Sequence, residues 1–184
     1  MNVSAYHGTS EEIANKIIIT EFIVDKNPRK LPGDLGRGIY SYVERDEKQL
    51  EAAANALKYV ESTKKSYEKY KVIKLHCDII EDEILDFNDI ENAQLFEEFR
   101  EENEQIIKEE MSNLYDNGFL KRGNIDGLVI EMMIDAFELT PCVIIKDTYT
   151  WFSKVKGDYK RSNFPNGREM CIRNQEIIKK KCII

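Results

Sequence analysis

The sequence predicts a single α+β domain, residues 1–184, and three observations carry that prediction. A length of 184 residues falls within the range of one ordinary domain. Hydrophobic residues make up 42% and charged residues 33%, with only 9 Gly and 4 Pro, which is typical of a globular chain and excludes a disordered tail or a fibre. Strand-like and helix-like segments are mixed irregularly and show no fixed-period repeat, which favours α+β over a regular βαβ array.

The first elements predicted are a strand, a helix and a loop. Residues 3–6 form a short apolar run typical of a strand. Thr9, with Glu12 three positions later, has the form of a capping box that opens a helix. Residues 25–36 are rich in Lys, Asn, Pro, Arg and Gly, which indicates a loop over the surface.

A second strand and a second helix follow the loop. Residues 38–42 predict the strand. Asp46 and Gln49 predict the cap of an Ala-rich helix that extends to about Tyr59 or beyond.

The remaining chain predicts further strands and one long acidic helix. Asn88 and Asp89 are the expected cap of that helix, residues 88–117, whose apolar residues recur at helical spacing up to Gly118. The further strands are expected at residues 71–77, 83–87, 127–130, 142–145 and 169–172. The total is about seven strands and three helices.

The net charge of −7 conceals two regions of opposite sign. Residues 81–116 hold 14 acidic against 2 basic residues, and residues 146–181 hold 10 basic against 4 acidic. The acidic stretch is typical of the solvated outer face of a helix, and the alternative is a docking surface for a basic partner such as an inhibitor or antitoxin. The basic stretch, rich in aromatic and turn residues, predicts an exposed loop that attracts phosphates or acidic surfaces, or a merely solvated loop.

Composition argues against a metal site and a membrane location. Cys77, Cys142, Cys171 and Cys182 lie far apart without a Cys-x-x-Cys pair, which predicts reduced thiols and no metal. No apolar run is long enough to cross a membrane, and the first ten residues lack the pattern of a secretion signal, so a cytoplasmic protein is expected.

Three short motifs hold the candidate site residues. They read Tyr6-His7-Gly8-Thr9, Leu35-Gly36-Arg37-Gly38-Ile39-Tyr40 and Gly167-Arg168-Glu169-Met170-Cys171-Ile172. Taken singly, each is typical of ordinary structure: a satisfied strand-end histidine, a core tyrosine and a surface glutamate. In this order, over nearly the whole chain, they resemble the His, Tyr, Glu signature of the diphtheria-toxin and poly(ADP-ribose) polymerase branch of the ADP-ribosyltransferases.

The resemblance implies a fold of two small split β-sheets with flanking helices and a cleft that binds NAD as substrate. It implies that His7 binds the adenosine ribose of NAD, that the Gly8 backbone holds the nicotinamide carboxamide, and that Thr9 helps to position that strand end. Tyr40 is expected to stack on the nicotinamide ring. Glu169 is expected to hold the nicotinamide ribose and to stabilise the cationic sugar formed as nicotinamide leaves.

Glycines at positions 8, 36 and 38 are expected to let the backbone approach a flat ring, Gly38 thereby serving in NAD binding; tight turns are the alternative. Two departures from the family pattern stand out. The helix after Tyr40 offers no aromatic residue before Tyr59 for the second face of nicotinamide. Gly167 stands where arginine-modifying relatives carry Glu or Gln.

These features predict an enzyme that transfers a single ADP-ribose from NAD to a macromolecule. The segment 148–168 precedes Glu169, where the family recognises its acceptor, and its basic and aromatic residues favour nucleic acid slightly over protein. A bacterial or phage toxin or an anti-phage effector is the expected setting. The alternatives are an NAD glycohydrolase using the same site, a catalytically inactive binding module of the same fold, and a small structural protein in which the motifs are coincidental.

Overall fold

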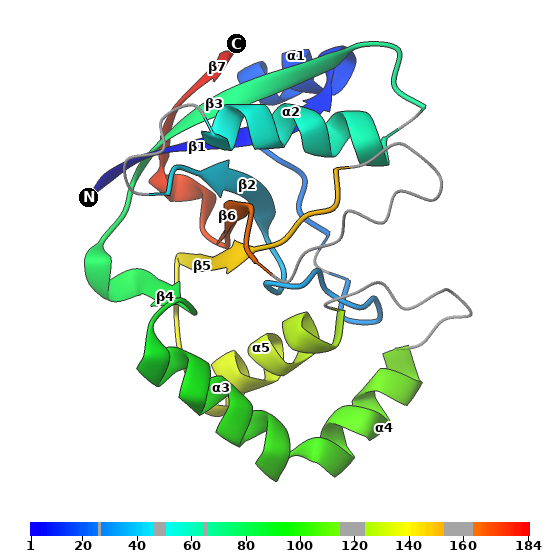
Figure 1. The fold of residues 1–184 in the computed structure, drawn as a ribbon, viewed down its shortest axis with the longest axis vertical. Coiled ribbons are helices and arrows are strands. Elements are labelled where there is room, and N and C mark those ends of the chain that lie inside the picture. The colour runs from blue at the N-terminus through cyan, green and yellow to red at the C-terminus, as the bar shows by residue number, and fades with distance from the viewer. Residues whose placement is uncertain (26, 46–50, 65, 115–123, 153–163) are drawn as a thin grey trace.

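Helices and strands alternate irregularly along the chain of the computed structural model, which describes residues 1–25, 27–45, 51–64, 66–114, 124–152 and 164–184 (Figure 1). In chain order the elements are β1 (Asn2–Ser10), α1 (Glu11–Ile19), β2 (Ile39–Val43), α2 (Glu51–Thr63), β3 (Tyr70–Asp78), β4 (Ile84–Asp86), α3 (Ile90–Glu102), α4 (Glu104–Leu114), α5 (Asn124–Ala136), β5 (Val143–Thr148), β6 (Gly167–Ile172) and β7 (Ile178–Ile183). Short 3₁₀ turns at Glu81–Glu83 and Gln175–Ile177 precede β4 and β7. The α+β class is confirmed.

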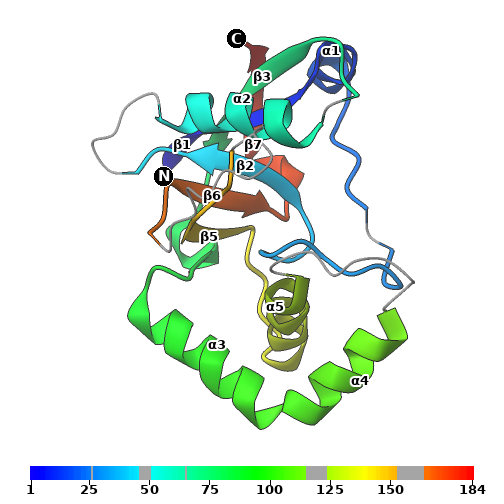
Figure 2. The same ribbon diagram turned by 45° about the vertical axis from the view of Figure 1, so that its right-hand side comes forward.

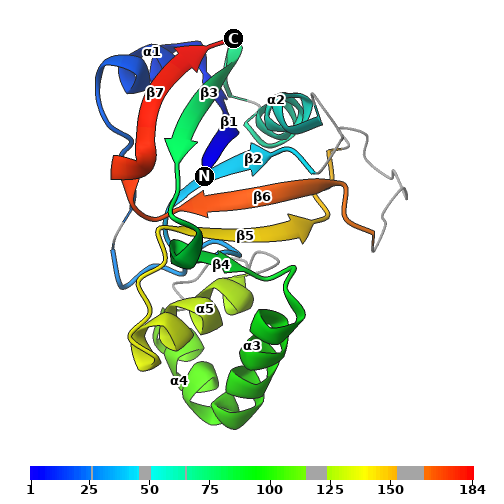
Figure 3. The ribbon, with the colours of Figure 1, turned by 90° about the vertical axis from the view of Figure 1, so that its left-hand side faces the viewer.

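The strands form one hydrogen-bonded sheet in the order β4-β5-β6-β2-β1-β3-β7, so the expectation of two separate sheets is wrong. All neighbours are antiparallel except β4 and β5. β1 pairs with β3 from Asn2 to Ser10, but with β2 only at Ala5 and Tyr6. The sheet thus consists of two groups of strands with a narrow junction, and Figure 3 shows β1, β3 and β7 crossing the direction of β2, β6 and β5.

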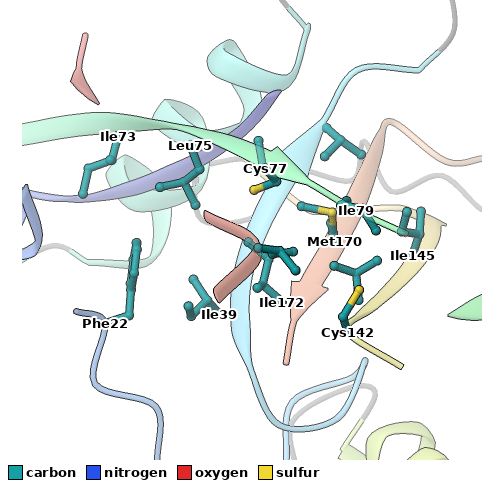
Figure 4. Packing of buried hydrophobic residues seen from close by; sticks show 14 of the residues in the cluster. Phe22, Ile39, Ile73, Leu75, Cys77, Ile79, Cys142, Ile145, Met170 and Ile172 are labelled. Carbon is teal, nitrogen blue, oxygen red and sulfur yellow. The ribbon is translucent and has the colours of Figure 1, made fainter. Parts of the chain in front are cut away.

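The largest core lies on one face of this sheet. Alternate residues of a strand share a face, and on this face Ile39, Leu75, Met170 and Ile172 meet Phe22 from the segment after α1 (Figure 4). The opposite face therefore carries the residues between them. There α2 covers β1 and β2, and α3, α4 and α5 pack beyond β5 (Figure 2).

One predicted strand is part of a helix, and one observed strand was not predicted. Residues 127–130, expected as a strand, belong to α5, because a short apolar run fits a buried helix equally well. Met133 and Val129 show the helical pattern, buried among the aromatic residues of α3. β7 was not predicted, because its consecutive lysines at 179–181 lack strand alternation; lysines are common on edge strands.

The N-terminal cap of α1 is Ser10, not Thr9 as expected. The Ser10 hydroxyl accepts a hydrogen bond from the Ile13 amide at 3.2 Å. Thr9 remains in β1, buried and paired with Lys71, because the strand that was expected over residues 3–6 continues to Ser10. Glu12, the other half of the predicted capping box, instead pairs with Lys16 at 2.6 Å.

The acidic segment folds as two helices instead of the single helix expected over residues 88–117. The predicted cap is confirmed, since the Asp89 carboxylate accepts the Glu91 amide at 2.8 Å. Asn103 ends α3, with its backbone and side-chain N–H groups both bonded to the Phe99 carbonyl. The predicted end near Gly118 lies outside the described residues.

The second predicted helix is α2, which runs to Thr63 and so beyond Tyr59 as expected. Its predicted cap, Asp46 and Gln49, lies outside the described residues. In the part of the chain that the structure describes, no helix has both the length and the hydrophobicity to cross a membrane. Within the same ranges, no three His, Cys, Asp or Glu side chains are grouped to hold a metal ion.

Candidate functional site

The sheet order places the three signature residues on adjacent strands. His7 lies on β1, Tyr40 on β2 and Glu169 on β6. β1 and β2 separate after Tyr6, and there the His7 Nδ1 atom donates a hydrogen bond to the Tyr40 carbonyl at 2.7 Å. The His7 side chain therefore links the two groups of strands at the point where their backbone pairing ends.

The His7 imidazole is held neutral. Burial lowers its pKa, and the hydrogen bond to the Tyr40 carbonyl only partly opposes this effect. The edge of the imidazole also meets the Phe22 ring, with centroids 5.2 Å apart. Because Nδ1 carries the donated proton, Nε2 of the neutral ring is an acceptor. His7 thus offers one acceptor atom to a hydroxyl group.

Glu169 is a nearly buried carboxylate with one oxygen fixed by hydroxyl groups. The side chain is 9% exposed, and Oε1 accepts from Tyr42 Oη at 3.0 Å and Thr150 Oγ1 at 2.8 Å. Burial raises the pKa of Glu169 and the nearby charge of Asp34 raises it further, while the hydroxyls oppose both effects by favouring the charged form. The carboxylate is consequently a stronger base than an exposed glutamate.

The second oxygen of Glu169 is left for a ligand. Among the described residues, none donates a hydrogen bond to Oε2. Thr148 Oγ1 is the one buried side-chain polar atom of the described ranges without a hydrogen-bond partner. The Thr148 hydroxyl lies close enough to lower the pKa of Glu169 without forming a hydrogen bond of ordinary geometry.

Aromatic side chains lie near Tyr42, whose hydroxyl bonds to this carboxylate. Tyr42 lies directly across from Glu169 in the sheet, and its ring centroid is 6.4 Å from those of Tyr59 and Phe152. The Lys58 ammonium lies 5.9 Å from the Phe152 centroid. α2 therefore supplies an aromatic residue to the site through Tyr59, the position at which the sequence offered the first aromatic of this helix.

The segment before Glu169 is closed at its base by amide hydrogen bonds. The Asn166 side chain accepts from the Thr150 amide at 2.9 Å and donates to the Thr150 carbonyl at 2.8 Å. Buried Asn55 of α2 donates to the Asn166 carbonyl at 2.9 Å. These bonds place the Thr150 hydroxyl against Glu169. Most of the predicted acceptor loop, residues 153–163, lies outside the described residues.

Tyr40 is anchored at its hydroxyl end. The hydroxyl donates to the Gly36 carbonyl and accepts from the Leu35 amide, each at 2.8 Å. Burial raises the Tyr40 pKa, so the hydroxyl remains protonated. The ring forms one wall of a hollow of about 180 Å³, whose other walls come from residues 24–25, 30–33 and 36–38. Neither His7 nor Glu169 lines this hollow.

The predicted glycines have packing roles. A Cβ on Gly8 would lie 2.1 Å from the Ala56 carbonyl oxygen of α2, and one on Gly38 would lie 2.5 Å from the Cys171 sulfur. At these two positions it is α2 and β6 that approach the backbone closely. Gly36 has a φ of +81° and ends a tight turn, which confirms the turn alternative at that position.

Three residues of the site, Tyr42, Thr150 and Asp34, were not predicted from the sequence. Tyr42 was detectable, because it lies two residues after Tyr40 and so shares its face of the strand. Thr150 and Asp34 belong to loops, and no sequence periodicity marks them. The structure therefore enlarges the candidate site by two hydroxyls and one carboxylate.

The Tyr42 hydroxyl provides a test of how Glu169 is tuned. Its hydrogen bond favours the carboxylate, so Tyr42→Phe should raise the Glu169 pKa and move the acid limb of any Glu169-dependent activity to higher pH. We expect a loss of about tenfold at neutral pH, the equivalent of one hydrogen bond. Activity measured from pH 5 to 9 checks this. Tyr6→Phe, in the same cluster, is the matched control and should keep the wild-type profile; a profile for Tyr42→Phe superimposable on wild type would contradict the assignment.

Comparisons of the chain with models of protein families, with curated proteins and with solved structures found no match. The arrangement of residues around Glu169 therefore carries the functional argument.

Proposed function

We propose that the protein transfers ADP-ribose from NAD to a macromolecular acceptor. The observation that carries this proposal is the state of Glu169: two hydroxyls fix one carboxylate oxygen, no described residue donates a hydrogen bond to the other, and Tyr42, one of the two donors, packs near Tyr59. The ordered resemblance of the three motifs to ADP-ribosyltransferases supplies the reaction class.

The chemistry requires one well-placed negative charge. When the bond between the nicotinamide nitrogen and ribose C1 breaks, its electron pair leaves with neutral nicotinamide and a cationic ribosyl group forms. A carboxylate fixed beside the ribose stabilises this charge more than it stabilises bound NAD. The acceptor atom bonds to C1 as the bond to nicotinamide breaks, and it releases its proton. Glu169 Oε2 is the atom available for the ribose.

We assign His7 and Tyr40 to the two ends of NAD, which must reach across the junction of the sheet, because the His7 ring packs against Phe22 on one face and the Tyr40 ring lies on the other. The unprotonated Nε2 of His7 can accept a hydrogen bond from a ribose hydroxyl. The anchored Tyr40 ring can stack on nicotinamide, at a gain of about 0.5–1.5 kcal/mol beyond the buried area. Gly8, Thr9 and Gly38 remain proposed contacts through backbone atoms, since their side-chain positions are taken up by packing or burial.

Labelling with NAD tests the transfer directly. NAD labelled on the adenine side is incubated in cell extract with wild-type protein or Glu169→Gln, followed by separate nuclease and protease digestion. Label in a macromolecule with wild type alone supports transfer, and the digestion that releases it identifies the acceptor class. Free ADP-ribose alone would identify a glycohydrolase, and neither label nor released nicotinamide would favour a binding module.

A nucleic-acid acceptor predicts a steep salt dependence. Residues 146–181 carry six net positive charges, and salt weakens binding in proportion to the number of phosphates that such charges neutralise. Neutralisation of three to four phosphates of a single strand would lower acceptor affinity by about 20–50-fold between 50 and 200 mM salt. Filter binding of single-stranded RNA and DNA measures it, with a neutral-backbone oligomer as control. An affinity that stays flat with salt would remove nucleic acid as acceptor.

A further inference from the structure

A second carboxylate, Asp34, lies in a turn tied to the candidate site. The turn spans residues 33–36 and is closed by a hydrogen bond from the Gly36 amide to the Gly33 carbonyl at 3.1 Å. The Tyr40 hydroxyl bonds to the backbone of Leu35 and Gly36. Asp34 therefore sits on a turn held in place by the end of the Tyr40 side chain.

The sheet register places this turn beside Glu169. Tyr40 and Cys171 are opposite one another, and Tyr42 and Glu169 form the next such pair on the same face. Two residues along a strand span about 7 Å. Leu35 is 1% exposed and packs in one cluster with Cys171. The turn therefore covers the pair formed by Tyr40 and Cys171, which is next to the pair that contains Glu169.

The charges around Asp34 indicate the same location. A negative charge on Asp34 raises the pKa values of Tyr40, Tyr59 and Glu169, which come from β2, α2 and β6. The charge of Asp34 thus acts on groups from three different elements. The side chain is half-buried among them.

Two charged groups from other elements act on the pKa of Asp34. Burial raises the Asp34 pKa, Asp126 of α5 raises it further, and Lys146 of β5 opposes both. Lys146 lies across from Glu169 in the sheet, with its ammonium 6.0 Å from the centroid of the Phe96 ring. A carboxyl with a raised pKa is suited to accept a proton near neutral pH.

We propose that Asp34 is the general base of the transfer and that it takes the proton from the attacking nucleophile. The inference rests on the proposed function and adds to it. As the bond from ribose C1 to nicotinamide breaks, the nucleophile's oxygen or nitrogen bonds to C1 and its proton passes to the Asp34 carboxylate. Glu169 stabilises the cation while Asp34 activates the nucleophile, as the general-base carboxylate of inverting glycoside hydrolases activates water.

Nicotinamide release from NAD with water as nucleophile tests this role. Asp34→Asn should lower the rate by about 10²–10⁴-fold, the usual contribution of a general base. Azide, a nucleophile without a proton to lose, should restore the rate in Asp34→Asn and yield a ribosyl azide. Azide should not restore Glu169→Gln, which lacks the charge that stabilises the cation. Glu176→Gln, which changes an exposed carboxylate outside the site, is the control and should keep the wild-type rate.

The outcomes separate this inference from the proposed function. Release by wild type with an equal rate and pH profile for Asp34→Asn would overturn the base. A slow Asp34→Asn without rescue by azide would also overturn it, because a purely structural role is not restored by a small anion. No release by wild type would overturn the proposed function and the base together.

A stability measurement tests, without NAD, whether Asp34 and Glu169 lie close together. If the two carboxylates repel one another, Asp34→Asn and Glu169→Gln should each stabilise the fold at neutral pH, and the double variant should gain less than the sum. Urea unfolding of the four proteins at pH 7.5 measures this. Additive effects would show that the two groups do not share a site and would overturn the inference even if NAD cleavage is found.

Discussion

Glu169→Gln is expected to abolish NAD cleavage and at the same time to stabilise the folded protein at neutral pH. The substitution keeps the shape of the side chain and an oxygen able to accept from Tyr42 and Thr150. It removes the negative charge that would stabilise the cationic ribose. We expect the rate of nicotinamide release to fall by about 10²–10³-fold or more, the loss seen when a group that stabilises developing charge is removed.

The gain in stability follows from the raised pKa of Glu169. Burial and Asp34 make the carboxylate costly in the folded state, so the folded pKa exceeds the unfolded one. This group therefore favours folding at a pH below the unfolded carboxyl pKa, and that contribution is lost as pH rises through the folded pKa. A neutral glutamine avoids the loss. The free energy of unfolding should be similar for the two proteins near pH 4, and higher for Glu169→Gln at pH 7.5.

Urea unfolding at the two pH values, together with a nicotinamide-release assay, checks both parts of this prediction. Exposed Glu176 supplies the control, since Glu176→Gln should keep its activity and change stability by no more than about 0.5 kcal/mol. Wild-type activity in Glu169→Gln would exclude the carboxylate from the reaction. Loss of activity combined with loss of stability at neutral pH would instead indicate a structural role for Glu169.

The sequence predicted the strands that carry the signature residues but not their surroundings. His7, Tyr40 and Glu169 fall on adjacent strands because each motif combines a polar residue with a strand-forming run, which local pattern reveals. Thr150 and Asp34 reach the site through loops. Their positions depend on bonds to residues distant in sequence or to side chains within a turn, such as Asn166 and Tyr40, which no local pattern encodes.

The observed sheet differs from the one that the resemblance implies. Two separate sheets were expected, yet β1 and β2 pair at Ala5 and Tyr6 and join all seven strands. Beyond Tyr6 the strands diverge, and the His7 side chain replaces backbone pairing by its bond to the Tyr40 carbonyl. The sequence could not reveal the junction, because two residue pairs are too few to alter the pattern of either strand.

Gly127→Ala is expected to cause the largest loss of stability among single-methyl additions near the site. In an exposed helix the same change would stabilise by about 1 kcal/mol, because alanine favours helix more than glycine does. Here a Cβ would lie 1.6 Å from the Gly33 carbonyl oxygen and 3.2 Å from the Gly36 amide nitrogen. The obstacle is backbone, so α5 or the turn of residues 33–36 must shift.

Such overpacking costs about 1–3 kcal/mol or more. For a domain of this size each kcal/mol corresponds to roughly 2–4 °C in Tm. Thermal unfolding of Gly127→Ala against wild type measures it, and Asn113→Ala, on the exposed side of α4, is the control with a neutral or slightly positive effect. An unchanged or higher Tm for Gly127→Ala would mean that α5 does not pack on this turn.

The same substitution should also affect the proposed reaction, because the displaced turn carries Asp34 and bonds to the Tyr40 hydroxyl. Activity should fall even below the unfolding temperature, where the protein remains folded.

The residue that follows the turn is also attached to α5. The Glu131 carboxylate accepts a hydrogen bond from the Arg37 amide at 2.6 Å and pairs with Arg173. Glu131→Gln should weaken that attachment without adding bulk. If both variants lose activity while keeping circular dichroism spectra of folded protein, the position of the turn, rather than the fold as a whole, limits the reaction.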